Sequence, residues 1–219
     1  MKGENTYLFL KILIKIITMY KIAAFIEFDK KITNKILSQK KIVKKRFGNQ
    51  IYLKHPVHLT LFTLNIKKIN ELKKIYINDK GKQSKPFSIS ITQPGIFYND
   101  PLTGGHTFFH HIKKNKKISE IQLKHLKKIN QNLDVLKKNI RLFKNDILQN
   151  NYKKYGFPFV DKIWIPHTTI ASIKNLKKNN KYTKQFLSKK IKLKSYVKEL
   201  KFYKILKDKH EFLFNVKDF

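Results

Sequence analysis

The sequence predicts an α+β fold with two similar lobes, each an antiparallel sheet with helices packed outside it, and a central cleft between the lobes. Short apolar or alternating runs, typical of strands, are interspersed with segments whose apolar residues recur every three or four positions, as in helices. A strand, helix, strand unit occurs in each half of the chain. No linker rich in Gly, Pro or Ser separates the halves, so we expect a single two-lobed domain.

The first half is predicted to contain four strands and two helices. Tyr20–Phe28 is a bounded apolar run typical of a strand. The lysine-rich segment that follows places Ile32, Ile36 and Val43 at helical spacing before Gly48. The other elements expected in this half are strands at 57–64, 87–97 and 106–112 and a helix at 67–78.

The second half is predicted to begin with helix and to end with strands. Apolar residues at helical spacing from Ile118 to about Leu148 predict one long amphipathic helix or two joined helices. The segment Tyr155–Ile173 returns to strand character. A short helix is expected at 179–190, and the strands 196–206 and 210–216 are expected to form a closing hairpin around Lys207–Lys209.

The first 18 residues look apolar but belong to no predicted element. Lys11, Lys15 and Lys21 interrupt the run YLFLKILIKIITMYKIAAFIEF, so it lacks the roughly 20 uncharged residues that a membrane span requires. No small-residue cleavage site of a signal peptide follows it. Because Met19 directly precedes the first strand, we interpret residues 1–18 as an N-terminal extension or a misassigned start, and residues 19–219 as the domain. We expect no stable membrane insertion.

The formal net charge of +35 comes almost wholly from lysine, since Arg46 and Arg141 are the two arginines. A coding bias toward A and T explains the lysine excess most simply. Whatever its origin, such a charge attracts polyanions, and the binding weakens with salt. RNA or another oligonucleotide is the favoured partner, and an anionic membrane surface stays open as an alternative. Because lysine lacks the bidentate fork of arginine, the excess favours general attraction of phosphate over base-specific recognition.

Cysteine is absent from the sequence, which excludes disulfides, thiolate zinc sites and a cysteine nucleophile. A cytoplasmic location is the expectation for such a chain. No heptad pattern or exposed apolar stripe demands a partner chain, so we expect a monomer.

Two stretches, HPVHLTLF and IPHTTIA, each place a histidine two positions before a threonine in a strand-like run. In a strand these two side chains point to the same face. His58 and Thr60 therefore share a face, and His167 and Thr169 share another. A single copy is best explained as a strand-edge histidine satisfied by hydrogen bonds, but one copy in each half favours a shared functional site.

Two histidines suit acid and base catalysis at a phosphodiester. With an ordinary pKa near ~6.5, one imidazole can be neutral and accept a proton while the other is charged and donates one. The threonine hydroxyls can donate to phosphate oxygens. We expect no metal and no cofactor, because His55 and His58 face opposite ways in an extended chain, His110 and His111 diverge, and no carboxylate cluster lies nearby. No role is assigned to His106, His125 or His210.

The residues HLTL (His58–Leu61) and PHTTIA (Pro166–Ala171) resemble the paired motifs of the two-histidine phosphoesterase superfamily, in particular its bacterial 2'-5' RNA ligase and cyclic phosphodiesterase branch. The first strand, a middle strand, a long helix before the second motif and a closing hairpin extend this resemblance over about 19–219. Members of that family are two-lobed α+β proteins with one motif in each lobe. Here the resemblance implies a first-motif lobe at about 50–112 and a second motif at about 160–175.

By this resemblance His58 and His167 would be the acid and the base, in an order that the sequence leaves open, and Thr60 and Thr169 would hold the phosphate. The expected function is a metal-independent phosphodiesterase that hydrolyses RNA 2',3'-cyclic phosphate or 2'-5' linkages. Two alternatives stay open: a phosphodiesterase that degrades 2'-5' oligoadenylate or cyclic oligonucleotide messengers, and a non-catalytic basic RNA-binding module.

Three residues near the motifs carry secondary expectations. Phe62 would share the face of His58, so it could stack on a nucleobase, with a core position as the alternative. Trp164 is expected in the core. Many members of the family carry an arginine shortly after the second motif, whereas this chain continues ASIK, so Lys174 would replace it only as a point charge.

Overall fold

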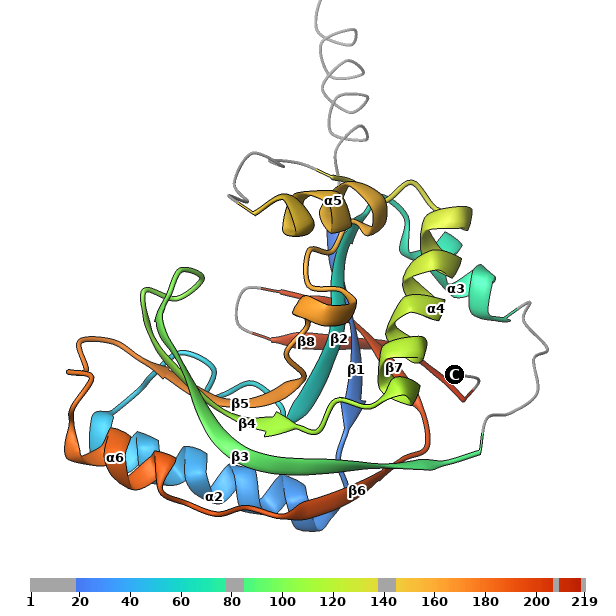
Figure 1. Cartoon of the computed structure of the whole chain (residues 1–219). Helices are drawn as coiled ribbons and strands as arrows, with labels where there is room; N and C mark the ends of the chain where they lie inside the picture. Colours follow the sequence, from blue (N-terminus) through green and yellow to red (C-terminus); the bar gives the residue numbers. More distant parts are fainter. Residues whose placement is uncertain (1–18, 78–84, 138–144, 207–208, 218–219) are drawn as a thin grey trace, which may run out of the picture.

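The computed structural model describes residues 19–77, 85–137, 145–206 and 209–217, and these residues form two four-stranded antiparallel sheets (Figure 1). In the first sheet the strand order is β2-β1-β7-β8, and the strands are β1 (Tyr20–Glu27), β2 (His58–Ile66), β7 (Leu200–Ile205) and β8 (His210–Val216). In the second sheet the order is β5-β4-β3-β6, and the strands are β3 (Phe87–Asp100), β4 (Gly105–Ile112), β5 (His167–Ile173) and β6 (Leu193–Val197). The predicted α+β class with two sheets is confirmed.

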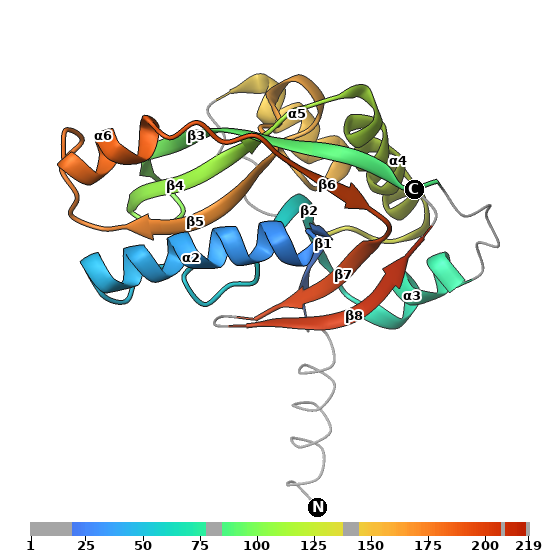
Figure 2. The same cartoon turned by 90° about the horizontal axis from the view of Figure 1, so that it is seen from below.

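The described part of the chain also forms five α-helices. Their bounds are α2 (Lys30–Phe47), α3 (Ile69–Ile77), α4 (Lys116–Asn132), α5 (Asp146–Tyr155) and α6 (Lys181–Leu187). Helices α2 and α6 pack against the second sheet, α4 packs against the first, and α3 and α5 contact α4. Tyr76 of α3 packs its ring 5.0 Å from that of Phe202 on β7, and Phe186 of α6 packs 5.1 Å from Phe108 on β4. Figure 2 shows α2 running alongside the second sheet, although α2 follows β1 of the first.

Helix α2 begins and ends where the sequence predicts. The Asp29 carboxylate accepts a hydrogen bond from the backbone nitrogen of Ile32 at 2.9 Å, which satisfies a free donor of the first turn. Gly48 ends the helix with φ at +70°, in the left-handed region that glycine adopts without strain.

The division of the chain between the sheets differs from the prediction. The expected first-motif lobe at 50–112 is split, because β2 belongs to the first sheet while β3 and β4 pair with β5 in the second. The strand expected at 196–206 is also split, because the chain leaves the second sheet after Val197 and enters the first at Leu200. The sheet to which each of these strands belongs depends on pairing between segments far apart in the sequence. Local sequence patterns do not reveal such pairing.

Other boundaries were refined by the structure. The strand expected over 155–173 is reduced to β5, and a short 3-10 helix occupies Asp161–Ile163. The helical pattern from Ile118 gives two helices, α4 and α5, while residues 138–144 between them lie outside the described part, as do the hairpin residues 207–208. Residues 1–18 are outside it too, so their interpretation stays a prediction. No helix in the described ranges is long and apolar enough to cross a membrane.

Candidate active site

The two His-x-Thr elements lie at the edges of the two sheets, and those edges meet. His58 is the first residue of β2 and His167 is the first residue of β5, each an outer strand of its sheet. Strands β2 and β5 lie against each other, and both views show their beginnings close together (Figures 1 and 2). A β-bridge between Ile51 and Ser172, with a 3.0 Å hydrogen bond, ties the segment before β2 to β5. The fold thus brings the predicted motifs into one region.

Each motif strand carries a bulge directly after its threonine. On β2 the pairing with β1 passes from Thr60 to Phe62 and leaves out Leu61. On β5 the pairing with β4 passes from Thr169 to Ala171 and leaves out Ile170. Opposite the two threonines stand equivalent residues, Phe25 on β1 and Phe109 on β4. A bulge re-aims the side chains beyond it, so the two strands share a local geometry as well as a sequence.

The bulge corrects the prediction for Phe62. Strict alternation would place this ring on the face of His58, but the extra residue Leu61 turns it inward. Phe62 is completely buried and packs 6.2 Å from the ring of Phe202. Base stacking on Phe62 is therefore wrong, and its core alternative is correct. Trp164 is buried in the core, as expected.

Both motif histidines are held by the same backbone contact. Nδ1 of His58 lies 2.8 Å from the carbonyl oxygen of Pro56, and Nδ1 of His167 lies 2.7 Å from that of Ile165. A carbonyl oxygen can only accept, so each Nδ1–H donates and the Nε2 of the neutral ring keeps its lone pair. Each imidazole is thereby fixed in orientation, with Nε2 available to take up a proton or, once charged, to donate one.

The surroundings of His58 favour its neutral form. The ring of Phe25 stacks on it at 3.7 Å, and the ring of His210 lies at 5.5 Å. Burial, with a further contribution from His210, lowers the pKa of His58 to about 3. His210, whose ring is 4.6 Å from that of His55, has a pKa lowered to about 4 by burial and by its neighbours His55 and Lys40. No role was predicted for His210, and the structure places it beside His58.

His167 has a similar aromatic setting with a different charge balance. The rings of Phe97 and Phe109 lie 5.2 and 5.0 Å from it. Burial lowers the pKa of His167, while the nearby carboxylate of Asp100 acts in the opposite direction. Gly95 on β3 makes room for this cluster, because a Cβ there would lie 2.6 Å from Cζ of Phe109. The carboxylate of Asp100 favours the charged form of His167, and His58 has no such carboxylate among the causes of its shift.

Aromatic side chains continue from His58 across the first sheet. Tyr203 on β7 lies 5.3 Å from Phe25 and 5.6 Å from Phe212 on β8, measured between ring centroids. Phe212 is 54% exposed. These three rings, Phe25, Tyr203 and Phe212, form an aromatic wall beside the first motif. Local sequence patterns could not reveal this wall, because its residues come from three different strands.

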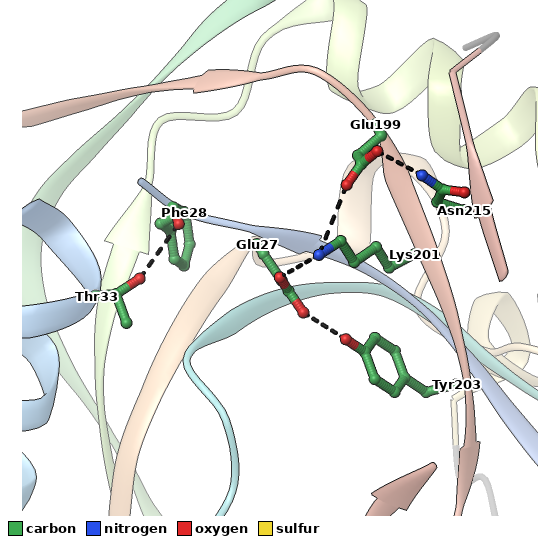
Figure 3. A network of polar contacts seen from close by, with 7 residues as sticks. All are labelled: Glu27, Phe28, Thr33, Glu199, Lys201, Tyr203 and Asn215. Carbon is green, nitrogen blue, oxygen red and sulfur yellow. Dashed lines mark hydrogen bonds and ion pairs between the residues drawn. The ribbon is translucent and has the colours of Figure 1, made fainter. Parts of the chain in front are cut away.

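A polar network borders the same motif (Figure 3). Glu27, directly opposite His58 in the strand pairing, accepts hydrogen bonds from Lys201 at 2.7 Å and from the hydroxyl of Tyr203. Glu199 contacts the same lysine at 3.6 Å. Burial and the hydrogen bond to Glu27 raise the pKa of Tyr203, so its hydroxyl stays protonated. The network fixes β7 to β1 at the level of the site.

Buried polar side chains from the helices support the motif strands. Nε2 of Gln122 on α4 donates to the carbonyl oxygen of Leu61 at 2.7 Å. Nζ of Lys40 on α2 donates to the carbonyl oxygens of Tyr52 and His55 at 2.8 and 2.7 Å, and burial lowers its pKa to about 8. Sequence reasoning missed these residues, although polar side chains at the core-facing positions of helices were a visible signal.

No group of three or more His, Asp or Glu side chains suited to a metal occurs in the ranges that the structure describes.

Thr60 and Thr169 are half-buried on their strands. Lys174 is exposed directly after β5, and its backbone nitrogen donates to Oε1 of Gln50 at 3.3 Å.

Comparisons with known proteins give structural matches only. No protein-family profile matches the chain, and no curated protein sequence does. The crystal structure of TT0787 of Thermus thermophilus matches with a TM-score of 0.60 and 15% identity, over 90% of this chain and 96% of that one. A structure described as a phosphoesterase matches with a TM-score of 0.52 and 11% identity, over 92% and 99% of the chains. E. coli LigT complexed with 3'-AMP matches with a TM-score of 0.51 and 9% identity, over 91% and 98%. The chain therefore shares the fold of these proteins.

Proposed function

We propose that the protein is a metal-independent phosphodiesterase that hydrolyses RNA 2',3'-cyclic phosphate or 2'-5' phosphodiester linkages. The observation that carries this proposal is the equivalence of the two motif strands. Each presents a histidine whose Nδ1 is bound to a carbonyl two residues upstream, a threonine on the same strand, and a bulge after that threonine. A basic surface alone would require none of these features.

The chemistry needs one base and one acid. For a cyclic phosphate, Nε2 of one histidine removes a proton from water as the water oxygen attacks phosphorus. The bond from phosphorus to one ribose oxygen breaks, and the other histidine, as imidazolium, protonates that leaving oxygen. We assign the base to His58, because burial keeps it neutral and able to accept a proton, and the acid to His167, because Asp100 favours its charged form. Thr60 and Thr169 would donate to the non-bridging oxygens.

An oligonucleotide is the substrate class that the charge favours. The net charge of +35 attracts phosphate, and E. coli LigT, which shares the fold, has been crystallised with 3'-AMP. By the precedent of the family that the motifs resemble, the product would carry a 2'-phosphate, and the reverse reaction would join RNA ends without ATP. Degradation of 2'-5' oligoadenylate or cyclic oligonucleotide messengers uses the same phosphate chemistry, so a substrate panel distinguishes it.

The test measures turnover in EDTA of a nucleoside 2',3'-cyclic phosphate and of 2'-5' linked oligoadenylate. Replacing either histidine, His58→Ala or His167→Ala, is expected to lower kcat by about 10²- to 10⁴-fold while substrate binding is mostly kept. Circular dichroism shows whether each variant folds. Full activity in both variants would refute the mechanism, and binding of RNA without any turnover by the parent protein would favour the non-catalytic module.

A further inference from the structure

A groove lies on α2 next to the segment that leads into β2. Its volume is about 320 Å³, at the lower end of the range of small-molecule sites. The residues that line it are Asn34, Leu37, Ser38, Lys40, Lys41, Lys44 and Leu53. Six of these belong to one face of α2, and Leu53 comes from the following loop.

The groove combines positive charge with two apolar side chains, Leu37 and Leu53. Helix α2 carries eight basic residues and no acidic one in its sequence KKITNKILSQKKIVKKRF. Lys41 and Lys44 are exposed, and neither forms an ion pair with any residue in the described ranges. Leu37 is 38% exposed beside them. Such a surface complements a nucleotide, whose phosphates carry negative charge and whose sugar and base offer apolar area.

Lys40 links the groove to the segment that leads into the first motif. Lys40 lines the groove and donates to the carbonyl oxygens of Tyr52 and His55. The ring of His55 contacts His210, which in turn lies against His58. The charge of Lys40 also contributes to the lowered pKa of His58, so the two lie within electrostatic reach.

We propose that this groove binds the RNA backbone next to the scissile phosphate, so that the enzyme prefers oligonucleotides to mononucleotides. The proposal rests on the proposed function for its substrate. Phosphates of the strand would contact Lys41 and Lys44, and a sugar or base would cover Leu37 and Leu53. The strand would cross the segment Tyr52–Pro56 between the groove and the motif.

The experiment compares a nucleoside 2',3'-cyclic phosphate with RNA oligomers of increasing length that end in the same group. In the parent protein kcat/KM is expected to rise with length. In the variant Lys41→Glu/Lys44→Glu, the ratio of kcat/KM for the hexamer to that for the mononucleotide should fall by about tenfold or more. The control Lys117→Glu/Lys127→Glu makes the same charge change at exposed positions on α4 and should keep the ratio. The proposal would be overturned if this ratio of kcat/KM values fell by the same factor in both variants.

A binding assay separates this proposal from the chemistry. The Kd of a labelled, non-cleavable 2'-O-methyl RNA hexamer can be measured even if no substrate is turned over. A weaker Kd in the Lys41/Lys44 variant than in the Lys117/Lys127 variant supports the groove, and equal Kd values refute it. Vesicles of phosphatidylserine and phosphatidylcholine test the membrane alternative. If the Lys41/Lys44 variant loses vesicle binding but keeps RNA binding, the proposal is also refuted.

Discussion

Gln122 donates a hydrogen bond to the carbonyl oxygen of Leu61, the residue that the strand pairing leaves out directly after Thr60. A bulged residue loses its partners in the sheet, and here a fully buried side chain from α4 replaces one of them. The same amide also reaches the carbonyl oxygen of Phe159 at 3.1 Å. The helix therefore stabilises the irregularity that shapes the first motif.

Replacing this amide should destabilise the protein. In Gln122→Leu the buried carbonyl group of Leu61 and the partly buried one of Phe159 lose their donor, so we expect the free energy of unfolding to fall by about 1–3 kcal/mol, measured by urea denaturation. Gln93→Leu, at an exposed position on β3, is the control and should change the value by less than about 0.5 kcal/mol. Equal effects of the two substitutions would contradict this role of Gln122.

Adjacent threonines on β5 give a matched test of phosphate binding. Thr169 is half-buried on the face of His167, whereas Thr168 is completely buried and its hydroxyl has no partner in the described structure. Thr169→Val should lower kcat/KM by about 10- to 100-fold, the value of a hydrogen bond to a charged group. Thr168→Val should keep activity and stability. The idea fails if steady-state kinetics show the two variants to be equally active.

The aromatic wall Phe25–Tyr203–Phe212 is expected to hold the nucleobase that Phe62 cannot contact. Stacking of one base contributes about 1–3 kcal/mol, so Phe212→Ala should raise KM for a nucleoside 2',3'-cyclic phosphate by about 5- to 100-fold. Ribose cyclic phosphate without a base should show no change. Tyr196→Ala, which removes an aromatic ring that is 65% exposed on β6, is the control. A similar KM in both variants would exclude the wall as a base site.

Stability should decrease as the pH falls below the ordinary pKa of histidine. His110 is completely buried, its Nε2 pairs with Oε1 of Gln39 at 2.6 Å, and burial lowers its pKa to about 4. Between pH ~6.5 and that value the unfolded chain binds a proton that the native protein does not. The native state therefore loses up to about 3 kcal/mol from this group, and His58 and His210 act in the same direction.

The variant His110→Phe isolates this contribution. Urea unfolding at several pH values between 4 and 7 should give a shallower dependence of the unfolding free energy on pH than in the parent. Loss of the partner of Gln39 lowers stability at every pH, so the slope is the informative quantity. Parallel curves for the two proteins would show that His110 does not titrate as expected.

The class of fold, most elements and the closeness of the two motif strands, β2 and β5, were predictable from the sequence. These follow from local periodicity and from a pattern that occurs once in each half. The side of the strand on which Phe62 lies was not predictable, because one extra residue reverses the alternation and no turn residue marks it.

Two other features depend on contacts between distant segments. The assignment of β3 and β4 to the second sheet follows from the pairing of β4 with β5, which lies far along the chain, and local patterns carry no information on such a pairing. Gln39, Lys40 and Gln122 could have been noticed, since each interrupts the apolar stripe of its helix. Their partners are backbone carbonyls or a histidine far away in sequence, and these only the folded structure identifies.

The strand order β2-β1-β7-β8 has a consequence for the synthesis of the protein. The first motif leaves the ribosome early, but the neighbour of β1 on its other side is β7, which begins at Leu200. At ordinary translation speeds, synthesis of the chain between β1 and β7 takes on the order of ten seconds, and this edge of β1 has no partner strand during that time. During this interval the incomplete sheet is a target for chaperones. Glu27, beside the first motif, gains Lys201 and Tyr203 only after β7 has been synthesised, so the polar network next to this motif is among the last parts of the fold to form.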